Sequence, residues 1–439
     1  MEKTFVQGSM VSLDKVEGDL YVEDGVVESS TPDRTLHVLG NTKCEGSCRF
    51  NCGLVTKSIE STRGNLDIDG ILRVADQVNV RNGDLYVGGD FEADRVRVNR
   101  SVKIDGSLST GSVEGGGSVR VRGDVESERL RVGGSFRCGS DVRIERINVG
   151  GSVTIDGEAE AGLIEVGGTF RGYGYIEADV VDVGGSFKAD SEVTLGSIDV
   201  GGTVRLSGGK IVREVDVGGS FKSSEPIDFG YIDVGGTVRL SGGSGGDIDI
   251  GGTLKSEGDL KIQRLKVGGT VKIDGNLEAE YVQVGGTLRT YGNLSLKKDL
   301  RVGGKVDVSE FLRARSIKVG GKLEGKRVEA EKSIETNVLV TERGAKAPRI
   351  EIGRRGKAEG VLVADDIILR DRARAGDLYG IRVSLQRKCR AGNIYADEVK
   401  IEPGCRVAKI IYTEDLKIYG DIRLDSPSEK VEKLPHPPF

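Results

Sequence analysis

The chain is dominated by a repeat whose mark is a Gly-Gly dipeptide preceded by Val or Ile. Successive pairs recur about every 17 residues, a period typical of solenoids, with one step shorter by one position and one step longer by one. The first glycines of the pairs are Gly133, Gly150, Gly167, Gly184, Gly201, Gly218, Gly235, Gly251, Gly268, Gly285, Gly303 and Gly320. Because so short a unit cannot bury its own apolar face, the period predicts a solenoid of units stabilised by stacking.

The unit from residue 267 to residue 283 shows how one coil is built. Its apolar residues alternate with polar ones in three short runs, and alternation with a period of two indicates a strand with one buried face. The runs are Val271/Ile273, Leu277/Ala279 and Val282/Val284. The sequence therefore predicts an all-β fold, a single-stranded parallel β-helix of triangular section with about 17 residues per coil. Roughly 24 coils at ~4.8 Å would give a rod on the order of 110 Å long.

The pattern divides the chain into four segments. Residues 1–60 form irregular amino-terminal β coils, and residues 61–321 carry the Gly-Gly repeat. Residues 322–424 keep nearly the same period without the Gly-Gly mark and are richer in Lys and Arg. The proline-containing tail, residues 425–439, is expected to be disordered, since proline cannot continue a strand ladder. A docking peptide ending in Phe439 is the alternative.

Composition and terminal sequence set the expected location. The net charge of −5 nominates no polyanionic partner. No apolar run approaches the ~20 residues that span a bilayer, and the start lacks the apolar core of a signal peptide. We expect a cytoplasmic protein, with association at a membrane left open.

Six cysteines are too few and too scattered for a disulfide framework. Cys44, Cys48 and Cys52 are spaced as Cys-x3-Cys-x3-Cys, and thiolates are ligands for zinc or an iron-sulfur cluster. This spacing matches no familiar metal motif and no fourth ligand is evident. Alternate residues on one strand would already place the three on one face, which favours a small apolar packing row. We expect no cofactor.

Positions one period apart lie above one another in a solenoid, so a column in the sequence is a stripe on the surface. The outward site of the first strand is basic in eleven of twelve coils: Lys103, Arg120, Arg137, Thr154, Arg171, Lys188, Arg205, Lys222, Arg239, Lys255, Lys272 and Arg289. The outward site before the Gly-Gly corner is acidic in Glu165, Asp182, Asp199, Asp216, Asp233 and Asp249. In one interpretation, the cations reach round the corner to these acids or remain solvated. In the other, the stripes bind another copy of the chain, an anionic polymer or a membrane surface.

The carboxy-terminal coils concentrate positive charge further. The cations expected in register on both sides of an inward small residue are Arg355, Lys357, Arg372, Arg374, Lys388, Arg390 and Arg406. The inward position is Gly356, Ala373, Cys389 or Cys405, so these two cysteines are interpreted as core residues. An anionic surface or an acidic protein is the partner that this cluster indicates. Nucleic acid is not favoured, because no aromatic platform accompanies the charges.

No convincing catalytic constellation is evident in the sequence. Aliphatic residues about six apart partly resemble the left-handed hexapeptide β-helix of acyltransferases and gamma-type carbonic anhydrases, enzymes that depend on histidine. The only histidines are His37, in the irregular start, and His436, in the tail. Carboxylate pairs such as Asp67/Asp69 recur with the repeat and are interpreted as surface residues. We expect neither an enzyme nor a small-molecule substrate.

Two carboxy-terminal segments, residues 356–364 and 391–401, resemble the Gly-x-Ile-x-Ala-x-x-Val-x-Ile repeat of the bactofilins, a family of polymer-forming β-helical cytoskeletal proteins. The resemblance covers residues 345–424 well and the Gly-Gly coils loosely. It implies a right-handed triangular β-helix that joins end to end into filaments without nucleotide, often at a membrane. This chain is several times longer than a typical member and has no clear amino-terminal anchor.

Polymerisation is also expected on physical grounds, because an uncapped β-helix ends in unpaired N–H and C=O groups that template another copy. The expected contacts are Phe5, Val6 and Leu20 at one end and Tyr412, Leu416, Ile418 and Tyr419 at the other. The alternative is a scaffold that does not polymerise and binds an anionic partner through its basic columns.

Overall fold

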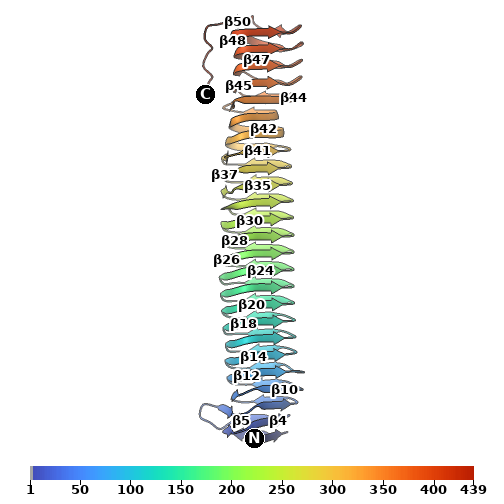
Figure 1. The fold of residues 1–439 in the computed structure, drawn as a ribbon, viewed down its shortest axis with the longest axis vertical. Coiled ribbons are helices and arrows are strands. Elements are labelled where there is room, and N and C mark those ends of the chain that lie inside the picture. Colours follow the sequence, from blue (N-terminus) through green and yellow to red (C-terminus); the bar gives the residue numbers. More distant parts are fainter. Residues whose placement is uncertain (1–2) are drawn as a thin grey trace. The chain divides into compact units, whose positions relative to one another are not determined.

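The computed structural model describes residues 3–439 and is all-β, with parallel strands in a β-solenoid of about 25 turns (Figure 1). This confirms the predicted fold class. The chain forms two compact units, Met1–Ser224 and Glu225–Phe439, called here the amino-terminal and carboxy-terminal units. None of the described residues lies in a helix that could span a membrane.

The strands of the amino-terminal unit are short and follow one another around each coil. They are β1 (Lys3–Gln7), β2 (Met10–Leu13), β3 (Lys15–Val16), β4 (Asp19–Glu23), β5 (Val26–Ser29), β6 (Thr35–Val38), β7 (Thr42–Glu45), β8 (Cys48–Phe50), β9 (Gly53–Thr56), β10 (Ile59–Ser61), β11 (Leu66–Ile68), β12 (Leu72–Val80), β13 (Leu85–Val87), β14 (Phe91–Val98), β15 (Val102–Ile104), β16 (Leu108–Gly115), β17 (Val119–Val121), β18 (Val125–Val132), β19 (Phe136–Cys138), β20 (Val142–Val149), β21 (Ser152–Ile155), β22 (Ala159–Val166), β23 (Thr169–Gly172), β24 (Ile176–Val183), β25 (Ser186–Ala189), β26 (Glu192–Val200), β27 (Thr203–Leu206), β28 (Gly208–Val217) and β29 (Ser220–Ser223).

The carboxy-terminal unit continues the pattern, and its strands lengthen where the chain rounds a corner without a break. They are β30 (Ile227–Val234), β31 (Thr237–Leu240), β32 (Gly243–Ile250), β33 (Thr253–Ser256), β34 (Leu260–Lys261), β35 (Arg264–Val267), β36 (Thr270–Ile273), β37 (Leu277–Ala279), β38 (Tyr281–Val284), β39 (Thr287–Thr290), β40 (Leu294–Leu296), β41 (Asp299–Val302), β42 (Val306–Thr341), β43 (Ala345–Lys346), β44 (Arg349–Glu359), β45 (Leu362–Leu369), β46 (Leu378–Leu385), β47 (Arg390–Ile401), β48 (Arg406–Ile418), β49 (Arg423–Leu424) and β50 (Glu429–Lys430).

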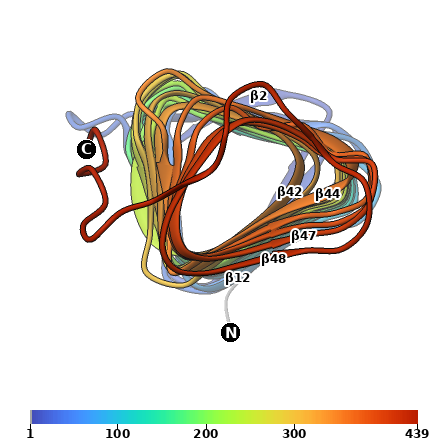
Figure 2. The same cartoon turned by 90° about the horizontal axis from the view of Figure 1, so that it is seen from above.

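Each coil has three sides (Figure 2). Its alternating aliphatic residues are buried. Val153 in the amino-terminal unit is 1% exposed, and Val271 in the carboxy-terminal unit is fully buried. Phe170 stacks on Phe187 one coil later, with the ring centroids 4.9 Å apart and the rings 11° from parallel. The core of each unit is therefore a continuous column of side chains, in which every coil covers the one before it.

The Gly-Gly corners bring the backbones of successive coils into close contact. A Cβ atom added at Gly184 would lie 2.5 Å from the carbonyl oxygen of Gly167, and one at Gly201 would lie 2.5 Å from that of Gly184. Backbone atoms cannot move aside as a flexible side chain can. Glycine is therefore required here by the closeness of the next coil, and neither Gly184 nor Gly201 has a positive φ.

The first coils differ in length, as the irregular pattern predicts. Lys3 pairs with Asp19 across one short coil, whereas Leu20 pairs with Thr42 across a longer one. The longer coil accommodates a loop at residues 30–34, just before β6.

The tail differs from the expected disorder. β49 pairs with Arg406–Val407 just before the tail, and β50, within the tail, pairs with Ile411–Tyr412, so the tail begins as part of a further coil. Beyond β50 the chain leaves the stack, since the prolines between Leu434 and Phe439 cannot donate ladder hydrogen bonds. The Arg327 guanidinium lies over the Phe439 ring, 5.5 Å from its centroid. The closing aromatic is thus docked on the side of earlier coils.

Candidate functional site: charged ladders and coil ends

Most outward cations of the Gly-Gly coils are paired with carboxylates. In the amino-terminal unit, Lys188 Nζ lies 2.6 Å from one oxygen of Asp190, and Arg171 Nη2 lies 3.2 Å from the other. Hydrogen bonds from Lys188 and then Arg171 hold the pKa of Asp190 below its ordinary value. In the carboxy-terminal unit, Lys272 pairs with Asp274 at 3.1 Å. Further pairs are Lys103–Asp105, Arg137–Asp156, Lys255–Glu257 and Arg289–Asp307.

The position of these carboxylates corrects the sequence interpretation. The partner lies two residues after the cation on the same coil, or at the corresponding place on the next coil, and not in the acidic column before the Gly-Gly corner. The two columns lie on different sides of the coil, so the cations do not reach round the corner. Four cations of this column have no carboxylate within ion-pair distance in residues 3–439. These cations are Arg120, Arg205, Lys222 and Arg239.

The acidic column of the amino-terminal unit is consequently uncompensated. Asp182, Asp199 and Asp216 are aligned on successive coils and are all exposed, and we call them the acidic ladder. None of the three has an ion pair or side-chain hydrogen bond in the described part of the chain. Partial burial raises the pKa of Asp199, and the charges of Asp216 and Asp182 raise it further. By contrast, Asp249 in the other unit pairs with Lys266 at 2.6 Å.

The carboxy-terminal coils place cations on both sides of one corner, as predicted. Lys357, Arg374, Arg390 and Arg406 are aligned on four successive coils. The inward residues between the columns are buried, including Ala373, Cys389 and Cys405.

These cations differ from those of the Gly-Gly coils in having few partners. Lys357 pairs with Glu359, and Arg406 pairs with Asp425 at 3.1 Å. The remaining five cations of this cluster are all exposed, and no carboxylate of residues 3–439 lies within ion-pair distance of them. We call these five the basic ladder: Arg355, Arg372, Arg374, Lys388 and Arg390.

Sequence analysis missed the backbone geometry of this corner. Arg355, Arg372 and Lys388 have φ values of 59°, 62° and 59°, in the left-handed region, and Gly404 occupies the same place on the next coil with φ of 78°. The N–H of Arg372 donates to the carbonyl of Arg387, and the N–H of Lys388 donates to that of Pro403. The only sequence signal is the glycine at position 404, which marks one coil of the four.

The amino-terminal end of the stack presents an open strand edge. Within residues 3–439, strands β1, β2 and β3 each pair with one strand only, on the second coil. Phe5 is 70% exposed and stacks on Tyr21, with the ring centroids 4.9 Å apart. Val6 and Leu20, also predicted for this contact, point into the core and are 3% and 0% exposed. Phe5 is thus the predicted residue that is available at this end.

The carboxy-terminal end is only partly covered. Tyr412 pairs with β50, whereas the last stretch of β48, from Asp415 to Ile418, pairs with β47 alone among the described strands. Ile418 is 42% exposed and Tyr419 is 49% exposed, and Leu416 is half-buried. At this end, the surface available for the predicted contact between copies is therefore the side of the last coil that carries Ile418 and Tyr419.

Cys44, Cys48 and Cys52 are buried core residues, although the expectation that they share one strand is wrong. Cys44 lies on β7 and Cys48 on β8, because a turn at Gly46 separates them, and Cys52 follows β8. No group of three or more His, Cys, Asp or Glu side chains within residues 3–439 is arranged to hold a metal ion. Burial raises the pKa of the Cys52 thiol to about 11, which disfavours the thiolate that binds metals.

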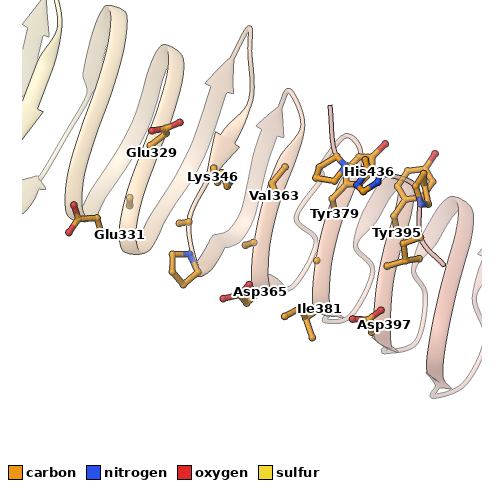
Figure 3. Close-up of a pocket in the computed structure, with 18 of the residues that line it drawn as sticks. Glu329, Glu331, Lys346, Val363, Asp365, Tyr379, Ile381, Tyr395, Asp397 and His436 are labelled. Carbon is orange, nitrogen blue, oxygen red and sulfur yellow. The ribbon is translucent and has the colours of Figure 1, made fainter. Parts of the chain in front are cut away.

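A groove of about 660 Å³ lies between the tail and the side of the last coils (Figure 3). Tyr379 and Tyr395 form part of its wall and are stacked with their centroids 4.4 Å apart. Glu329, Asp365 and other carboxylates also line it, together with residues 434–437 of the tail. His436 lies in this groove and His37 is exposed on β6. The two tyrosines are separated by one coil of the repeat, a signal that sequence analysis did not use.

No family model, curated protein or solved structure matches the chain. The resemblance to the bactofilins therefore stays a prediction, and the functional argument rests on the coil ends and the two ladders.

Proposed function

We propose that this chain is a non-enzymatic structural protein, a β-solenoid that associates end to end into filaments or scaffolds without nucleotide. The observation that carries the proposal is the open strand edge at both ends of the stack, each beside an exposed apolar side chain. Unpaired edge N–H and C=O groups are satisfied when a second copy adds its own coil. The rigid, repetitive fold suits such a scaffold.

The two edges are also of compatible kind. Both belong to parallel strands of the β-solenoid, so a copy added at either end extends the existing hydrogen-bond pattern without a change of strand direction. Phe5 at one end and Ile418 at the other supply apolar area that joining would remove from water. The resemblance to the bactofilins points to the same function, in the cytoplasm or at a membrane.

A charge at the carboxy-terminal edge tests this proposal. We expect wild-type protein to form long threads in negative-stain microscopy and Ile418→Asp or Tyr419→Asp to give discrete particles, because a carboxylate would be buried without a partner at each junction. Tyr291→Asp is the matched control, since Tyr291 is 45% exposed but lies away from the last coil. Threads of unchanged length in both edge variants would exclude this end as the junction.

A scaffold that does not polymerise and binds an anionic partner is the second candidate. The observation that favours it is the basic ladder, whose five cations lack carboxylate partners in the described chain. Discrete particles of wild-type protein that bind anionic vesicles would support this candidate over the first.

A further inference from the structure

The basic ladder is retained at a conformational cost. A residue with a side chain is less stable in the left-handed region than in an ordinary conformation, because its Cβ crowds the backbone, and glycine escapes this cost. Three of the five cations, Arg355, Arg372 and Lys388, adopt it, although Gly404 shows that glycine fits the same corner. Strain that persists where a simple substitution would remove it points to a role outside folding.

The charges of this corner are also left uncompensated. In the Gly-Gly coils the residue two positions after the cation is often acidic, as in Lys188 followed by Asp190. In the basic ladder that position carries a second cation, since Arg372 is followed by Arg374 and Lys388 by Arg390. Like charges stacked on adjacent strands repel each other. A partner that brings several negative charges at the spacing of the coils would remove this repulsion.

The acidic ladder meets that requirement. Asp182, Asp199 and Asp216 are exposed, unpaired in the described chain and aligned on successive coils. Because both ladders follow stacked parallel strands, both have a rise of about 4.8 Å per charge. Two surfaces with the same rise and opposite sign match at every coil, whereas phosphates along a nucleic acid strand or in a lipid layer have other spacings.

We propose that the basic ladder of one copy binds the acidic ladder of a second copy, side by side. This contact rests on the proposed scaffold function and adds a lateral contact to the end-to-end one. Since the two ladders belong to different units, one molecule offers both surfaces and each can be occupied by a different neighbour. Exposed ion pairs are individually weak, so the contact depends on several pairs forming together.

Neutralising the basic ladder is the first test. The variant Arg372→Gln/Arg374→Gln/Arg390→Gln removes three unpaired cations, and Lys255→Gln/Lys272→Gln/Lys322→Gln removes three cations that have carboxylate partners. Both variants change the net charge by the same amount. We expect the first to weaken lateral association about tenfold or more in sedimentation at about 0.05 M NaCl, and the second to leave it nearly unchanged. Equal loss in both variants would overturn the proposal.

A charge exchange identifies the partner. One variant carries Arg372→Glu/Arg374→Glu/Arg390→Glu and the other carries Asp182→Lys/Asp199→Lys/Asp216→Lys. Each alone should fail to pair laterally, and an equimolar mixture should recover pairing, because each charge reversal meets its complement. A mixture that stays unpaired overturns the assignment, as does full pairing by the aspartate variant alone. Phosphatidylglycerol vesicles form a second arm, in which vesicle binding lost by the arginine variant with lateral pairing intact would assign the ladder to lipid instead.

Thread length and lateral pairing separate the two contacts. In Ile418→Asp, discrete particles that still pair side by side would support both contacts as independent. Long threads that never pair side by side would support the proposed function and overturn the lateral contact. Wild-type protein that pairs side by side but forms no threads would support the lateral contact and overturn end-to-end assembly.

Discussion

The Gly-Gly coils of the amino-terminal unit and the last coils of the carboxy-terminal unit form the same solenoid with different corners. In the former, glycines let the backbones approach, the core holds phenylalanines, and Asp190 balances its neighbouring cations. In the latter, cations with left-handed backbone angles form the corner, the buried residues are aliphatic or small, and five cations have no carboxylate partner in the described chain. Since nearly the same period serves both, the two regions share the inward pattern of side chains, whereas their corners differ in backbone geometry and charge.

The largest expected difference between the two regions lies in their cores. Phe187→Ala leaves a cavity beside Phe170 and should destabilise its coils by about 3–5 kcal/mol. Cys389→Ala removes one buried sulfur atom and should cost about 1 kcal/mol. Hydrogen exchange followed by mass spectrometry over the altered coil and its neighbours measures both. Equal effects would show that the two cores carry the same share of stability.

Substitutions at the two kinds of corner should change the stability of the protein in opposite directions. Gly184→Ala places a Cβ atom 2.5 Å from a carbonyl oxygen of the preceding coil and should destabilise by about 2–3 kcal/mol. Arg372→Gly relieves a left-handed backbone and should stabilise by about 0.5 kcal/mol, the relief being partly offset by the greater freedom of glycine in the unfolded chain. Thermal unfolding of the two variants beside wild type checks the signs. A loss of stability in Arg372→Gly would mean that the arginine side chain supports its corner.

The ion pairs of the Gly-Gly coils should have the smallest effect. The pKa of Asp190 is lowered in the fold, so its pairing contributes stability at neutral pH that is lost as the pH falls below 3.8, the ordinary pKa of the group, and through the folded value. Asp190→Asn should lower the free energy of unfolding at pH 7 by less than about 1 kcal/mol, which a small decrease in the thermal midpoint would report. The gap from wild type should close in acid, and a constant gap between pH 7 and pH 3 would contradict the pairing.

The fold was predictable because nearly every coil repeats the same pattern of apolar and polar residues. Alternation in residues 271–284 is enough to define three strands, and the constant spacing of the glycine pairs implies stacking, so even the contact of Phe170 with Phe187 follows from the sequence. The partners of the cations did not follow. Arg171 contacts Asp190 on the next coil, and this pairing depends on which way each side chain leans across the stack.

The tail and the cysteine cluster were misjudged for a related reason. Prolines show that the segment from Leu434 to Phe439 cannot continue the ladder, but they do not show that Phe439 finds a place beside Arg327. Likewise, the spacing of Cys44 and Cys48 fits one strand unless the turn at Gly46 is known. Both outcomes depend on contacts between distant residues.

The amino-acid sequence by itself determined the repeat, the inward and outward sides of every strand, and the columns of charge, because all three follow from local alternation and a constant period. Only the tertiary structure decided which charges are balanced, how the basic corner turns, and which predicted end residues are exposed. Those properties arise where side chains from different coils meet, and the distances between them are set by the stacking of the coils.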